Sequence, residues 1–154
     1  MSNVSDRLKE LGIILVPPTP PAAAFVPYVQ IERVLFLSGH IARRDGQPWV
    51  GRLGETMTTA EGKEAARAVA IDLLATLQAA TGDLTRIHRI AKLLVLVNSA
   101  PAFTEQHLVA NGASELLQEV FGEKGKHARS AFGVAQLPFG SCVEIELIAE
   151  VEVA

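Results

Sequence analysis

The sequence predicts an α+β protein in which two helices pack on one face of a mixed β-sheet. Three patterns carry this prediction. An apolar stripe behind a helix-capping motif predicts a long helix from residue 58, and a run of branched aliphatic residues at 87–97 predicts a buried strand. Residues 142–153 alternate apolar with mostly acidic side chains, which is typical of a strand. The predicted order of elements is β-β-β-α-β-α-β-β.

Residues 1–25 are predicted to form a proline-rich N-terminal arm on a single domain that spans 1–154. Residues 5–11 favour a short helical turn. Four prolines between Val16 and Pro21 exclude a helix there, because proline lacks the backbone N–H and clashes with the preceding turn. We therefore expect residues 16–24 to be extended and to lie on the domain.

Two short β-prone runs follow the arm. Residues 28–31 and 34–38 are separated only by Glu32 and Arg33, which predicts a tight hairpin. Gly46 and Gly51 then bracket a third short strand or loop.

Both predicted helices have recognisable ends. Thr58 and Glu61 form a capping box, in which each side chain pairs with a backbone N–H of the other residue, and Gly82 suits the C-terminal end. The second helix is predicted over 105–121 and ends at Gly122. Its expected core stripe comprises Leu108, Val109, Leu116, Leu117, Val120 and Phe121.

Two final strands, residues 130–137 and 142–153, are predicted to form a hairpin through Pro138-Phe139-Gly140. Arg129 enters the first strand, where its planar fork could bind a carboxylate through two parallel hydrogen bonds. Glu144 is expected across from it on the neighbouring antiparallel strand. From this pattern alone, an ordinary cross-strand ion pair is the favoured interpretation.

Composition excludes several classes of function. The net charge is -3 and the 14 basic residues are scattered, which disfavours a nucleic-acid role. No run is long enough to span a membrane, and the first residues lack an apolar signal core, so we expect a cytoplasmic protein. The single cysteine, Cys142, is expected in the core. The four histidines show no metal-ligand spacing, so no metal is expected.

Two helices can cover only one face of the sheet, and too little chain remains to cover the other. The uncovered face indicates an oligomer.

Four short motifs resemble the reactive-intermediate deaminase (Rid, or YjgF) family, also called endoribonuclease L-PSP-like, in the order that this family shows. They span residues 27 to 149 and comprise Pro27-Tyr28-Val29-Gln30, Leu37-Ser38-Gly39-His40-Ile41, Ala128-Arg129-Ser130 with Leu137-Pro138, and Val143-Glu144-Ile145-Glu146.

This resemblance implies a chorismate-mutase-like fold, a homotrimer with sites in clefts between subunits, and no cofactor. It implies hydrolysis of small carboxylate-bearing enamines or imines, such as 2-aminoacrylate, to keto acids and ammonia. By the same resemblance, Arg129 holds the substrate carboxylate and Glu144 places or activates a water. Tyr28, Ser38 and Gly39 are expected to line the pocket.

The chain departs from the family pattern at Ala131, where many members have cysteine, and at His40, where they have glutamine. The segment 98–114 is also unlike the best-known deaminases. His40 is either a structural residue or a group suited to proton transfer near neutral pH. Two other functions stay open: a small-molecule-binding regulatory trimer without turnover, and an endoribonuclease or translation inhibitor.

Overall fold

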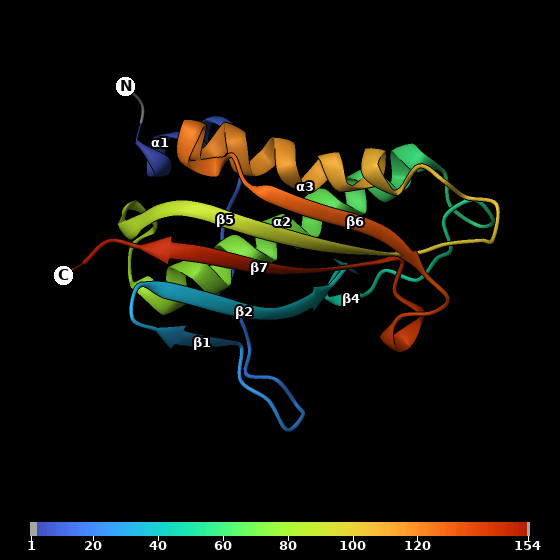
Figure 1. Ribbon diagram of the computed structural model, residues 1–154, viewed down its shortest axis with the longest axis horizontal. Helices are drawn as coiled ribbons and strands as arrows, with labels where there is room; N and C mark the ends of the chain where they lie inside the picture. The colour runs from blue at the N-terminus through green and yellow to red at the C-terminus, as the bar shows by residue number, and fades with distance from the viewer. Residues whose placement is uncertain (1–2, 154) are drawn as a thin grey trace.

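The structure, a computed structural model, describes residues 3–153. A five-stranded mixed sheet has the strand order β1-β2-β7-β5-β6, and two long helices lie behind one of its faces (Figure 1). The fold class predicted from the sequence is therefore confirmed. The main elements are α1 (Val4–Glu10), β1 (Tyr28–Ile31), β2 (Val34–Ile41), α2 (Thr59–Thr81), β5 (Ile87–Asn98), α3 (Gln106–Phe121), β6 (Ala128–Val134) and β7 (Val143–Val151). Short 3₁₀ turns lie at Leu84–Arg86, Gly122–Gly125 and Pro138–Gly140.

Two helical crossovers explain why both long helices lie on the same face. Helix α3 connects β5 to the parallel strand β6, and α2 carries the chain from β2 towards β5. Strand β7 then enters between β2 and β5, antiparallel to both. Crossovers between parallel strands are almost always right-handed, which places successive helices on one side of the sheet.

The hairpin predicted in the first third of the chain is confirmed. Strands β1 and β2 pair with Ile31 opposite Val34, so Glu32 and Arg33 form a two-residue turn. A small second hairpin joins β3 (Arg43–Arg44) to β4 (Gln47–Pro48). Its turn residues Asp45 and Gly46 both have positive φ, the conformation that such two-residue turns require.

The long helices begin and end close to the predicted residues. Thr58 and Glu61 form both bonds of the capping box, and Gly82 adopts the left-handed conformation at the C-cap. Helix α3 packs so closely on α2 that a Cβ at Gly112 would overlap the backbone oxygen of Lys63. One predicted core residue is wrong: Leu108 is 37% exposed, because it lies on the side of α3 that faces away from the sheet and α2.

The final hairpin predicted from the sequence is wrong. Strand β6 ends at Val134, and its only partner among residues 3–153 is β5, while β7 pairs with the other side of β5 and with β2. The residues Pro138–Gly140 therefore connect two strands that are not neighbours. The physical reason is the βαβ crossover, which makes β6 run parallel to β5 and leaves β7 to fill the gap beside β2.

The N-terminal arm is only partly packed on its own chain. The predicted short helix is present as α1, and Leu8, Leu11, Ile13 and Leu15 pack against the core. Residues 16–20 form no regular element and are exposed, and the chain bends at 22–25, which corrects the expectation that 16–24 is an extended segment lying on the domain. Within residues 3–153, no helix is long and apolar enough to cross a membrane.

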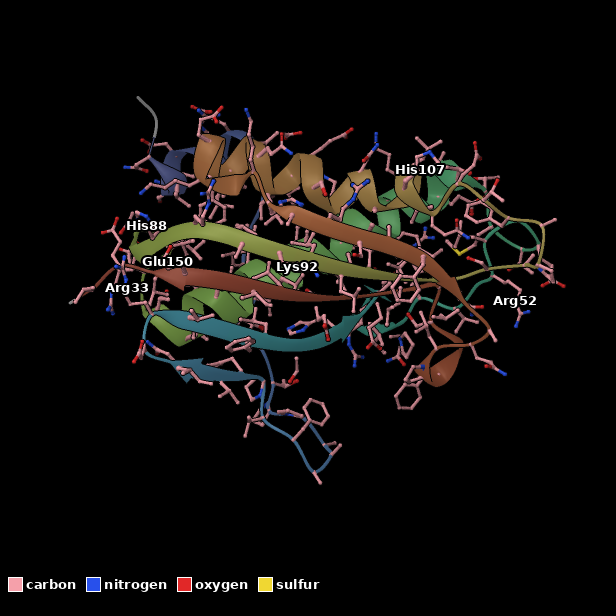
Figure 2. All side chains as sticks on the ribbon, viewed as in Figure 1. Arg33, Arg52, His88, Lys92, His107 and Glu150 are labelled. Carbon is pink, nitrogen blue, oxygen red and sulfur yellow. The ribbon has the colours of Figure 1, made fainter. Side chains whose placement is uncertain are left out.

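The sheet face away from the helices is open in the single chain and faces the viewer in Figure 1. Apolar side chains on this face and along β1 are substantially exposed, at 49% for Val29, 59% for Ile31, 42% for Phe36 and 46% for Phe132. The face also carries Lys92 on β5, the strand that lies between β7 and β6 (Figure 2). An uncovered apolar patch of this kind is typical of a surface that binds a partner or another copy.

Candidate functional site

Five of the six site residues predicted from the sequence lie in one region, where β1, β2 and β7 are side by side. Tyr28 on β1 stands opposite Leu37, and the Ser38 backbone N–H donates to the Pro27 carbonyl at 2.9 Å. Gly39 and His40 follow on β2, and Glu144 on β7 pairs with Ile41. A register shift between Leu37 and His40 marks a β-bulge at this point.

Glu144 lies directly over the backbone of Gly39 on the open face. A Cβ built on Gly39 would lie 2.5 Å from Glu144 Oε2, so a larger residue at this position would displace the carboxylate. Burial raises the pKa of Glu144, and the nearby Glu146 carboxylate raises it further. A carboxylate with a raised pKa can accept a proton from water more readily, which suits a general base.

His40 points the other way, towards α2. Its Nδ1–H donates to the Ser38 carbonyl at 2.7 Å, and its Nε2 accepts from the hydroxyl of the buried Thr76 at 2.8 Å. Burial lowers the pKa of His40, against the raising effects of the Ser38 carbonyl and the Asp72 carboxylate. The ring therefore ties β2 to α2, and a proton-transfer role remains only a prediction.

Arg129 stands apart from the other five. It lies on β6, the opposite edge of the sheet from β1, and its register partner Leu93 is buried on the helix side. Glu144 instead pairs with Leu96 and lies on the open face. The expectation that Glu144 lies across from Arg129 on a neighbouring strand is wrong, because β5 separates them and their side chains leave opposite faces.

The guanidinium of Arg129 is held against α3 by neutral groups. Its Nη1 donates to Asn111 Oδ1 at 2.8 Å and to Ser114 Oγ at 3.1 Å, and its Nη2 donates to the His107 carbonyl at 3.3 Å. Within residues 3–153, no carboxylate oxygen lies within 4.0 Å of it, so the alternative of a cross-strand ion pair is not observed.

A second histidine completes this network. His127 Nδ1–H donates to the Gly125 carbonyl at 2.6 Å, so its Nε2 accepts from the Ser114 hydroxyl at 2.8 Å. Burial lowers the pKa of His127, and the charge on Arg129 lowers it further, against the raising effect of the Gly125 carbonyl. The pair resembles a nucleophile with its base, but Ser114 is only 6% exposed and its oxygen accepts from Arg129. The arrangement therefore fits support of Arg129 better than covalent catalysis.

Sequence reasoning missed Asn111, Ser114 and His127. Two signals could have found them. Asn111 and Ser114 are three residues apart, which places them on one face of a helix, and His127 is two residues before Arg129, which places both on one side of an extended chain. The missing step was the knowledge that α3 lies over that side of β6.

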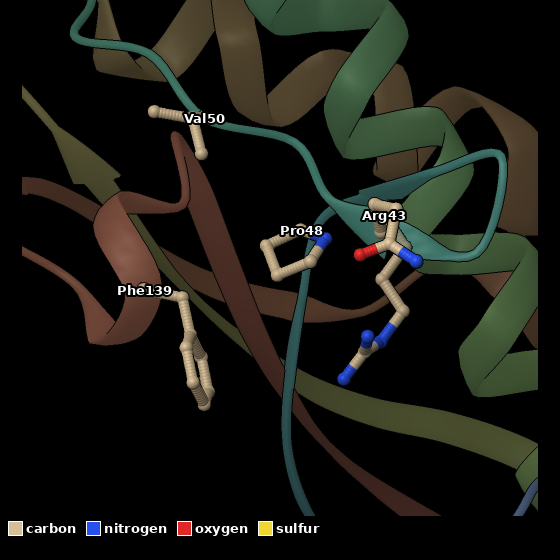
Figure 3. A pocket seen from close by; sticks show the side chains of 5 residues that line it. Arg43, Pro48, Val50 and Phe139 are labelled. Atoms are coloured by element: carbon tan, nitrogen blue, oxygen red, sulfur yellow. The ribbon is translucent and has the colours of Figure 1, made fainter.

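An open surface pocket lies beside the predicted residues, and none of them lines it. It has a volume of about 600 Å³, and Figure 3 shows Phe139 and Arg43 on either side of Pro48 within it. Its lining residues are Arg43, Gln47, Pro48, Val50 and Phe139. The backbone bond from Ala42 N–H to the Val143 carbonyl, 2.8 Å long, connects this region to the strand that carries Glu144.

No group of three His, Cys, Asp or Glu side chains within the described residues could hold a metal ion. Cys142 is fully buried, and burial raises its pKa to about 11, which agrees with the predicted core role.

The fold and these residues identify the class of protein. Residues 6–151 match the family described as "YjgF/chorismate_mutase-like, putative endoribonuclease", and the chain belongs to this family. The resemblance inferred from the four motifs is therefore confirmed.

Particular relatives cover nearly the whole chain. Protein TCP17 of Trypanosoma cruzi is 49% identical over 150 residues, which cover 96% of this chain and 94% of that protein. A crystal structure of the Agrobacterium tumefaciens protein Atu1372, whose function is unknown, has a TM-score of 0.88 at 43% identity and covers 97% of this chain and 94% of its own. The RidA protein of an Antarctic Psychrobacter has a TM-score of 0.56 at 27% identity, with coverages of 89% and 94%.

Proposed function

We propose that the protein hydrolyses small imines that carry a carboxylate, giving a 2-keto acid and ammonia. The observation that supports this proposal most directly is the state of Arg129, whose positive charge is held in place by three neutral acceptors. A guanidinium without a carboxylate partner is suited to bind the carboxylate of a ligand.

The reaction balances without a cofactor. A 2-aminoacrylate tautomerises to 2-iminopropanoate, water adds to the C=N carbon, and the C–N bond breaks to release ammonia and pyruvate. Arg129 holds the carboxylate of the imine, and Glu144 takes a proton from the attacking water. Tyr28, Ser38 and Gly39 line the pocket. Positioning of this kind can contribute several kcal/mol to the lowering of a barrier.

The site requires a second copy of the chain. Arg129 and Glu144 leave opposite faces of one sheet, and Tyr28 lies at the edge of the sheet farthest from β6. A cleft between subunits, with Arg129 from one copy and residues of the β1–β2 region from another, brings these groups around a single small molecule. The exposed apolar face of the sheet supports the same assembly.

The protein is expected to form a homotrimer. Light scattering behind a sizing column should give about three times the chain mass of 16.4 kDa at micromolar concentration. The physical reason is the exposed sheet face, which a single chain leaves in contact with water. A compact monomer would contradict both the trimer and the site between subunits.

The activity test is release of ammonia and keto acid from a panel of imines generated in the cuvette by an amino-acid oxidase. The protein is expected to accelerate hydrolysis of at least one imine above its spontaneous rate. Rates that stay at the spontaneous level for the whole panel would refute deamination.

One observation favours a second candidate, a small-molecule-binding trimer without turnover. Within one chain, the carboxylate-binding group and the proposed water-binding group lie on opposite faces, so carboxylate binding does not by itself place a water at the imine carbon. Keto-acid binding without faster imine hydrolysis would favour this function.

RNA cleavage, which the family description suggests, is expected to be absent. The net charge of -3 leaves little attraction for a phosphate backbone. The purified protein and its Arg129→Ala variant should both leave labelled single-stranded RNA intact. Cleavage that disappears in the variant and falls steeply with added salt would favour an endoribonuclease over an imine deaminase.

A further inference from the structure

The hydrogen bonds around Arg129 leave part of its fork unused. Both Nη1 hydrogens and one Nη2 hydrogen go to Asn111, Ser114 and the His107 carbonyl. Among the residues that the structure describes, the Nε–H and the second Nη2–H have no partner. Arg129 is therefore anchored on one side and retains two donors for a ligand.

Acidic side chains near this region are kept away from the guanidinium. Glu115, the residue after Ser114, turns to α2, where its carboxylate pairs with Lys63 at 3.0 Å. The positions that do contact Arg129 carry an amide, a hydroxyl and a backbone carbonyl, and each can accept a hydrogen bond without neutralising the charge.

The Ser114–His127 pair determines which groups donate and which accept in the hydrogen bonds around Arg129. The Gly125 carbonyl can only accept, so it holds the proton on His127 Nδ1 and leaves Nε2 as an acceptor. The Ser114 hydroxyl proton then goes to His127, which turns the oxygen lone pairs of Ser114 towards Arg129. Each group in this chain of bonds has the partner that it needs.

We propose that Asn111, Ser114 and His127 are positioning residues that orient the Arg129 guanidinium and leave its charge without a counter-ion, ready for the carboxylate of the substrate. The inference rests on the proposed role of Arg129. Asn111 offers the sharpest test of this inference. An aspartate there would keep the shape and the hydrogen bond of asparagine, but its negative charge would form an ion pair with Arg129.

The test is the Asn111→Asp variant, with pyruvate as the probe in an NMR titration. An Asp carboxylate 2.8 Å from Nη1 would form an ion pair with Arg129, so the affinity for pyruvate is expected to fall at least tenfold. The melting temperature should stay the same or rise, because the variant gains an ion pair. In the imine assay, KM should rise more than kcat falls. A purely structural asparagine would not separate binding from stability in this way.

The matched control is Gln78→Glu, which adds the same charge on the exposed side of α2 and should leave pyruvate binding unchanged. A second variant, Ser114→Ala, removes a buried hydroxyl without adding bulk. It should lower both pyruvate affinity and the melting temperature, because it leaves an Arg129 donor and His127 Nε2 unpaired.

The outcomes separate this inference from the proposed function. If Asn111→Asp binds pyruvate as the unmodified chain does while Arg129→Ala does not, the positioning role is wrong and the carboxylate site stands. If pyruvate binding depends on Asn111 but no imine is hydrolysed, the positioning role stands and deamination is wrong. If neither variant alters pyruvate binding, the role of Arg129 and the positioning role both fail.

Discussion

Replacement of Arg129 by alanine is expected to reduce pyruvate affinity by a factor of about one hundred or more. Loss of one partner from a hydrogen-bonded charge pair typically costs about 2–5 kcal/mol. Arg129→Lys keeps the charge but loses the planar fork, so it should still weaken binding at least tenfold. Titration of each variant with pyruvate, followed by NMR, measures both effects.

The lysine variant is informative because the groups that hold Arg129 are neutral acceptors arranged to fit a guanidinium. An ammonium group has three donors, but it cannot reach Asn111, Ser114 and the His107 carbonyl with the geometry of a guanidinium. Arg52→Lys is a suitable control, because Arg52 pairs with Glu55 on the surface at 3.4 Å. Unchanged affinity in Arg129→Lys, or pyruvate bound elsewhere in a soaked crystal, would show that Arg129 is not the carboxylate-binding residue.

Glu144→Gln is expected to lower kcat by roughly 10²–10⁴-fold, the usual contribution of general acid–base catalysis. Pyruvate affinity should stay nearly intact, because glutamine leaves Arg129 and its partners untouched. The comparison requires steady-state kinetics on the imine that the protein hydrolyses fastest, together with a pyruvate titration.

Glu150→Gln is the matched control on the same strand and the same face. Glu150 pairs with Arg33 at 3.3 Å at the far end of the sheet, where His88 also lies (Figure 2). Loss of this exposed pair should change the free energy of unfolding by about 1 kcal/mol at most and leave kcat unchanged. Equal, small effects of both substitutions would mean that Glu144 is only a solvated acid.

The features that sequence reasoning predicted well depend on neighbours in the chain. The capping box at Thr58, the left-handed Gly82 and the two-residue turn at Glu32-Arg33 are each determined within a few residues. The alternation in 143–151 also survives, because every second side chain of β7 faces the helices whatever its partner strands are.

The features that could not be predicted depend on partners distant in the sequence. The turn at Pro138–Gly140 gives no sign that β5 lies between β6 and β7. The position of β5 between these two strands separates Arg129 from Glu144 and leaves Arg129 under α3. The supporting residues Asn111 and Ser114 become visible only when the crossover of α3 above β6 is known.

The central position of β7 has a consequence for folding during synthesis on the ribosome. This strand is synthesised after every other strand of the sheet, yet it is the one that joins β1–β2 to β5–β6. Until residues 143–151 leave the exit tunnel, the nascent chain has two half-sheets with exposed edges and no way to close them. Completion of the five-stranded sheet is therefore expected only after this segment has been synthesised.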